Sequence, residues 1–117
     1  MLKDDKVYLG HMLEIAKKAS EHVKGKQRSD YDNNETLQFA LAHMVQIIGE
    51  AARCVSQKFQ SSHSEIPWRA IVGMRHKVVH DYMNVDEDTV WGTVIQDLPV
   101  LIRELEKILH SKGNLNP

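Results

Sequence analysis

The sequence has few of the features of a secreted or membrane protein. Its single cysteine, Cys54, can form no disulfide within the chain and cannot complete a cysteine-based zinc site. No apolar run reaches the roughly 18 residues of a membrane span. The charged N-terminus MLKDDKVYLG lacks the apolar stretch of a signal peptide. We therefore expect a cytoplasmic protein without a membrane partner.

Net charge is also nearly absent. The 15 Lys and Arg residues almost balance the 16 Asp and Glu residues, which leaves −1 over 117 residues. This balance excludes a coat protein that is cationic along its whole length, so nucleic-acid binding would need a local basic patch. The hydrophobic fraction of 42% is typical of a globular protein and excludes a wholly disordered chain. The length predicts a single domain, residues 1–117.

Proline and glycine are scarce, with 3 and 6 residues, so long helices are possible. Apolar residues recur with helical spacing in four segments, at about 3–24, 33–60, 67–80 and 86–110. The second segment is apolar on more than one face, which predicts packing on two sides. The polar segment 24–34 predicts a loop, and residues 111–117 a frayed tail. We therefore predict an all-α, antiparallel bundle of four to five helices.

Individual residues predict where these helices begin, bend and end. Gly25 is placed as a C-terminal cap. Asp32 and Glu35 have the spacing of a capping box at the start of the second helix. Asp86 is the expected N-cap of the fourth helix, and Pro99 is expected to kink or split it.

Standard enzyme signatures are missing: the sequence contains no glycine-rich phosphate loop, no G-x-S-x-G elbow and no H-E-x-x-H. The densest polar cluster is MRHKVVHDY, residues 74–82, at the predicted end of the third helix. It includes Arg75, His80 and three neighbours that could support a groove, namely His76, Lys77 and Asp81. His76 and His80 supply only two of the three or four ligands that a metal needs, so no metal site is predicted.

Arg75 and His80 are sufficient in principle to cleave RNA without a metal. The guanidinium of Arg75 can hold a phosphate with two hydrogen bonds and stabilise its charged transition state. His80 can move the proton of the 2′-hydroxyl or of the leaving group near neutral pH. In an ideal helix the two lie about 140° apart, so convergence needs the helix to end near His80 or a second subunit. A purely structural role for Arg75 is the alternative, because arginines at helix ends often pair with acids.

Other polar and aromatic residues have simpler interpretations. His43 and Glu50 lie seven residues apart on one face of the second helix. They either border a groove or are partly buried and satisfied by neighbouring helices. Trp68 and Trp91 lie on apolar stripes and are expected in the core, and Cys54 is expected to be packed and inert.

The spacing of Arg75, His80 and Tyr82 resembles the R-x4-H-x-Y motif of HepT-like HEPN-domain proteins. The similarity extends over about residues 3–109. It includes the N-terminal Asp-x-x-Tyr-Leu and the segments Ile47–Ala52, Ile66–Arg69, Ile71–Arg75, Val85-Asp86, Val90-Trp91 and Asp97–Pro99. His76 departs from the pattern, since the family often has a small polar residue there.

The resemblance implies a HEPN-type helical homodimer that acts as a metal-independent endoribonuclease, the toxin of a type VII-like toxin–antitoxin pair. Arg75 and His80 of both subunits would line a catalytic groove. The implied partners are RNA and an MntA-like nucleotidyltransferase antitoxin, which would transfer AMP from ATP to Tyr82. The toxin itself would need no cofactor. Two alternatives stay open: a non-catalytic HEPN module that binds a nucleotidyltransferase, and a structural dimerisation bundle.

Overall fold

Every regular element of the computed structural model is helical over the residues that it describes, 2–79 and 86–115; side chains are described for 2–74 and 86–110. The elements are α1 (Lys3–Val23), α2 (Arg28–Asp32), α3 (Glu35–Cys54), α4 (Gln57–Ser62), α5 (Trp68–Val79), α6 (Glu87–Gly92), the π-helical η1 (Thr93–Asp97) and α7 (Leu98–Leu115). The predicted all-α bundle is therefore confirmed.

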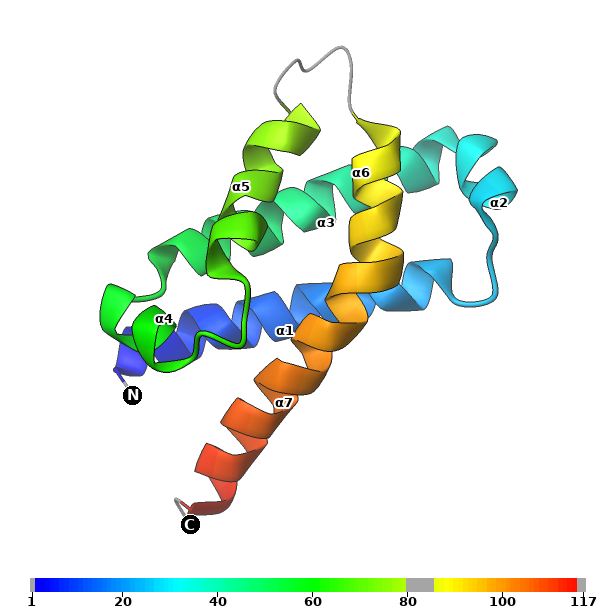
Figure 1. Ribbon diagram of the computed structural model, residues 1–117. Coiled ribbons are helices and arrows are strands. Elements are labelled where there is room, and N and C mark those ends of the chain that lie inside the picture. The colour runs from blue at the N-terminus through cyan, green and yellow to red at the C-terminus, as the bar shows by residue number, and fades with distance from the viewer. Residues whose placement is uncertain (1, 80–85, 116–117) are drawn as a thin grey trace.

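Two antiparallel helical pairs cross each other in the fold (Figure 1). α1 and α3 form one pair, and α5 and the rod formed by α6, η1 and α7 form the other. α3 packs against both α1 and α5, which confirms the prediction that the second apolar segment is covered on two sides. α7 in turn packs along α1, so α1 and α3 lie at the centre of the bundle.

One continuous core joins these helices. Its fully buried side chains include Leu9, Met12, Leu41, Val45, Ile48, Val90, Leu98 and Leu105. Burying each such side chain contributes about 1.5–3 kcal/mol. Trp68 is buried and Trp91 packs against the core, as predicted. Cys54 is a correction: as the last residue of α3 it is exposed rather than packed.

The predicted helix over 33–60 is in fact two helices, α3 and α4. Ser56 begins the second one, because its hydroxyl accepts a hydrogen bond from the Phe59 amide at 3.2 Å. The buried carboxylate of Asp5 accepts from the Ser56 amide and hydroxyl, each at 2.7 Å. The apolar periodicity continues through this junction, so the sequence pattern does not predict the break. The N-cap of α3 is Asn34, which accepts from the Leu37 amide at 3.0 Å, rather than Asp32.

The polar segment 24–34 is not a simple loop, because α2 lies within it. Gln27 and Asp30 form a capping box at the start of α2. Gly25 has a φ of 75°, a left-handed conformation that glycine adopts without strain, and its predicted capping role after α1 is confirmed. The turn-like composition of this segment conceals one aromatic residue, Tyr31, which is fully buried.

The last rod begins as predicted, with the Asp86 carboxylate accepting from the Thr89 amide at 3.0 Å. It changes direction between α6 and α7 (Figure 1), through the wide π-helical turn that precedes Pro99. α7 continues to Leu115, beyond the predicted helix end near His110, and the frayed tail at 111–117 stays a prediction. One glycine, Gly113, costs a helix only about 1 kcal/mol, which does not end it. Within residues 2–79 and 86–115, every helix is too short or too polar to span a bilayer.

Candidate functional site

The polar cluster 74–82 spans the end of α5. The backbone of Arg75, His76 and Lys77 lies in α5, which is described as far as Val79, and the predicted helix end near residue 80 stays a prediction. The side chains of these three residues are not among the described ones. His80, Asp81 and Tyr82 lie wholly outside the described residues. Whether Arg75 and His80 converge therefore stays a prediction, since His80 lies outside the described residues.

Apolar packing holds α5 in place up to the residue before Arg75. Trp68, Ile71 and Met74 are buried and recur every three residues along the helix face that is turned to the core. The indole Nε1 of Trp68 donates to the carbonyl of His63 at 2.9 Å, which fixes the start of α5 to the preceding turn. The start of the motif is therefore attached to a rigid, well-packed helix rather than to a loop.

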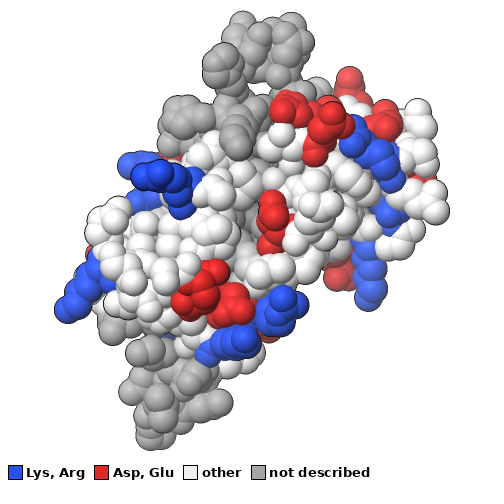
Figure 2. Space-filling view, in the orientation of Figure 1, with Lys and Arg blue, Asp and Glu red and all other residues white. Residues whose placement is uncertain are grey.

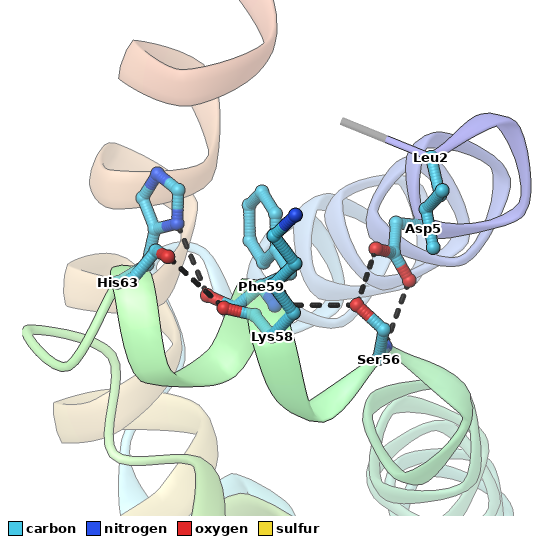
Figure 3. Close-up of a pocket in the computed structure, with 7 residues that line it drawn as sticks. Leu2, Asp5, Ser56, Lys58, Phe59 and His63 are labelled. Atoms are coloured by element: carbon cyan, nitrogen blue, oxygen red, sulfur yellow. Dashed lines mark hydrogen bonds between the residues drawn. The ribbon is translucent and has the colours of Figure 1, made fainter.

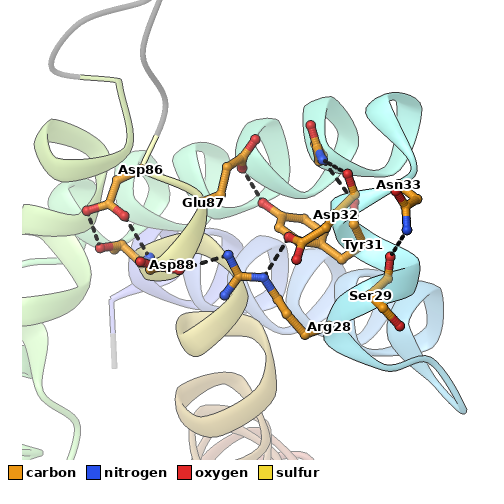
Figure 4. Close-up of polar contacts among 10 residues, drawn as sticks. Arg28, Ser29, Tyr31, Asp32, Asn33, Asp86, Glu87 and Asp88 are labelled. Carbon is orange, nitrogen blue, oxygen red and sulfur yellow. Dashed lines mark hydrogen bonds and ion pairs between the residues drawn. The ribbon is translucent and has the colours of Figure 1, made fainter.

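The other end of the segment 80–85 is held by contacts between α2 and the start of α6 (Figure 4). The hydroxyl of Tyr31 donates to the Glu87 carboxylate, and the Tyr31 ring lies 5.1 Å from the Trp91 ring, centroid to centroid. Arg28 pairs with Asp88 at 2.8 Å and with Asp32 at 2.8 Å. We call this set of contacts the α2–α6 clasp.

The clasp has clear electrostatic consequences. Burial, with the hydrogen bond to the Glu87 carboxylate, raises the pKa of Tyr31 far above its usual value, so its hydroxyl stays protonated and can donate. Hydrogen bonds to Asp32 and Asp88 raise the pKa of Arg28. Sequence reasoning missed the clasp, since its residues lie 56 positions apart and one partner sits in a turn-like stretch. The signal available was an isolated aromatic residue within that stretch.

His43 and Glu50 do not share one environment. His43 is exposed, so its interpretation as a partly buried group was wrong, because the face of α3 that carries it is left uncovered. Glu50 is half-buried and pairs with Arg53 on the same helix, which raises the pKa of Arg53. Glu50 also borders an apolar groove of about 350 Å³ between α1 and α3, to which α5 contributes no lining residue. A role for His43 and Glu50 beside Arg75 stays a prediction.

A further cavity of about 380 Å³ lies between the start of α1 and α4 (Figure 3). Three of its polar side chains already have partners, since Asp5 binds Ser56 and the His63 ring nitrogen Nδ1 lies 3.2 Å from the carbonyl of Phe59. The rings of Phe59 and His63 stack at 4.0 Å. These contacts join α1 to α4 and leave the cavity a structural feature.

No group of three or more His, Cys, Asp or Glu side chains in the described part of the chain could hold a metal ion. This statement does not cover the side chains of His76, His80 and Asp81, which are not among the described ones.

Comparison with known proteins gives one consistent picture. The family model described as "Ribonuclease HepT-like" matches residues 12–108. A protein of Caldanaerobacter subterraneus named "Putative RNase TTE0752" is 32% identical over 95% of this chain and 99% of its own. "Probable ribonuclease HepT" of Thermococcus cleftensis is 34% identical over 92% of this chain and 98% of its own. No solved structure matches the chain.

Proposed function

Because this chain belongs to the ribonuclease HepT-like family, we propose that it is an endoribonuclease that acts through Arg75 and His80. The observation that supports this proposal most is the family match over residues 12–108, within which both motif residues are present. The packing of α5 adds to it, since a buried apolar face leads directly to Arg75.

The proposed reaction needs one proton carrier and one permanent cation. His80 removes the proton of an RNA 2′-hydroxyl, and the 2′-oxygen attacks the adjacent phosphorus as the bond from phosphorus to the 5′-oxygen breaks. The leaving oxygen takes a proton from the imidazolium. Arg75 stabilises the extra negative charge on the phosphate oxygens, a role that a metal ion has in other nucleases. We therefore expect no requirement for a divalent metal.

We also propose that two chains form the working enzyme. One chain supplies a single Arg75 and a single His80, and a two-fold axis near the ends of the two α5 helices would place both pairs along one groove. Light scattering at micromolar concentration should give the mass of a dimer. A monomer that cleaves RNA at full rate would contradict this arrangement.

Control by an antitoxin is the third part of the proposal. The Tyr82 hydroxyl oxygen attacks the α-phosphorus of ATP on a partner nucleotidyltransferase, pyrophosphate leaves, and a phosphodiester with one negative charge results. Tyr82 lies two residues from His80 in the sequence. The new anion would compete with substrate phosphate for Arg75, and the attached adenosine would occupy space that RNA needs.

The direct test of the catalytic assignment is RNA cleavage by purified Arg75 variants. Arg75→Ala should lower the rate by at least about a hundredfold, the usual scale for removing a transition-state donor, and Arg75→Lys should recover part of it. Arg103→Ala, which removes an exposed arginine on α7, is the matched control and should cleave normally. Equal rates for Arg75→Ala and wild type, or loss of wild-type cleavage in EDTA, would refute the mechanism.

A further inference from the structure

A groove of about 600 Å³ runs between the end of α3, α4 and the start of α5, and the mechanism proposed above does not use it. Two arginines border it, Arg53 from α3 and Arg69 from α5. Uncharged polar side chains, including Gln57, Ser61 and Ser64, complete much of the lining. Such a surface presents hydrogen-bonding groups and positive charge together.

The charged side chains that line this groove are two arginines. No acidic residue is among the described side chains that line it. Arg69 is exposed and forms no ion pair with the described residues. Arg53 pairs with Glu50 on its own helix, but the Arg53 side chain is 57% exposed, and exposed pairs of this kind are readily exchanged for another anion. Figure 2 shows basic and acidic side chains in several small groups over this face, and acidic side chains are most numerous where α6 begins.

The groove borders the helix that carries the catalytic motif. Arg69 lies in the first turn of α5, six residues before Arg75, which is about 9 Å along the helix axis and about 120° around it. Pro67 and Arg69 also border an open depression with Ala70 and Gly73, farther along α5. A Cβ atom added to Gly73 would meet no atom within 4 Å, so a bound chain can approach the helix closely there. An open surface with two arginines therefore runs along the first turns of α5, on the helix that carries Arg75.

We propose that this groove binds the phosphates of the single RNA strand that flanks the scissile bond, with Arg69 and Arg53 as the contacts. The inference rests on the proposed ribonuclease function and assigns the path of its substrate. Two exposed arginines among uncharged polar side chains match a polyanion that can displace Glu50 from Arg53, and basic grooves that follow the backbone are how proteins hold single strands without reading their sequence. Gln57 and Ser61 can donate hydrogen bonds to sugar and phosphate oxygens.

The salt dependence of binding measures phosphate contacts directly. Labelled single-stranded RNA is titrated, by fluorescence anisotropy, with the protein in a His80→Ala background that prevents cleavage. The slope of log affinity against log salt should become shallower by about 0.7 for Arg69→Gln and by about 1.4 for the double variant Arg53→Gln/Arg69→Gln. The reason is that RNA releases fewer counterions on binding when a phosphate contact is missing. Arg69→Lys should keep the wild-type slope.

Lys58→Gln is the matched control, since Lys58 is an exposed cation on α4 that borders the cavity of Figure 3 instead of this groove. It should leave the slope unchanged. An unchanged slope in the Arg53 and Arg69 double variant would overturn the proposal, as would an equal change in Lys58→Gln. The proposal would also be overturned if the double variant bound RNA normally but bound a nucleotidyltransferase partner more weakly. That result would make the groove a protein-binding surface. The ribonuclease function is tested separately, by comparing RNA cleavage by wild type and by His80→Ala. Failure of the groove proposal can therefore be distinguished from failure of the ribonuclease proposal.

Discussion

Tyr31→Phe tests how the α2–α6 clasp holds the start of α6. The substitution removes one hydroxyl and leaves the fully buried ring in place against Trp91. The lost hydrogen bond runs to the Glu87 carboxylate, and a hydrogen bond to a charged group contributes about 1.5–3 kcal/mol. Glu87 is only half-buried, so water can replace part of the lost contact. We therefore expect the free energy of unfolding to fall by about 1.5 kcal/mol, at the low end of that range.

Urea unfolding at one fixed protein concentration measures this change, since an associating protein gains stability with concentration. A double-mutant cycle with Glu87→Gln isolates the pair and should give a coupling energy of about 1 kcal/mol. Tyr8→Phe is the matched control: Tyr8 is half-buried on α1, and its hydroxyl has no hydrogen-bond partner among the described residues. Its stability should change by less than about 0.5 kcal/mol. A coupling energy below about 0.3 kcal/mol, or an equal loss in Tyr8→Phe, would refute the reasoning.

Three further results are expected. Because the folded state raises the pKa of Tyr31, the unfolded chain releases that proton first above about pH 10, so stability should fall with rising pH there; denaturation at pH 9 to 11 should show a shallower fall in Tyr31→Phe. Asp5→Ala should cost about 2–4 kcal/mol in a melting experiment, because the Ser56 amide and hydroxyl lose a charged acceptor, whereas removal of the exposed Asp4 carboxylate should cost little. After incubation with the partner nucleotidyltransferase and ATP, intact mass should show one added adenylyl group per chain in wild type and none in Tyr82→Phe; equal gains would place the modification elsewhere.

The fold class and most helix positions are predictable because long helices leave a repeated signal. α1, α5 and the start of α6 match their predicted ranges within a few residues, since apolar periodicity and the Asp86 cap are local features. Packing of α3 on two sides also follows from the sequence, because apolar residues on more than one face need more than one neighbour.

The missed features depend on contacts between distant residues. The break at Ser56 is stabilised by Asp5, which lies 51 residues away, and α2 is held by Glu87 and Asp88 across the bundle. Neither interaction leaves a periodic pattern. The exposure of Cys54 and His43 was missed for a related reason, since periodicity predicts a face and does not say where a neighbouring helix stops covering it.

Some features of the candidate site are also predictable from the sequence, and others depend on contacts between distant residues. The Arg75 and His80 spacing is readable from the sequence, and so is the helix that carries Arg75. The groove between Arg53 and Arg69 is not, because its walls come from three helices and become neighbours only when α4 turns away from α3 at Ser56. That turn is the same feature that the periodic pattern conceals.

The central claim is that His80 is the proton carrier of a metal-independent ribonuclease. The most direct measurement is the rate at which purified wild type and His80→Ala cleave one defined RNA, both in EDTA. The account predicts rapid cleavage by wild type and a rate at least about a hundredfold lower for His80→Ala at equal helical content. Cleavage by His80→Ala at the wild-type rate would contradict it.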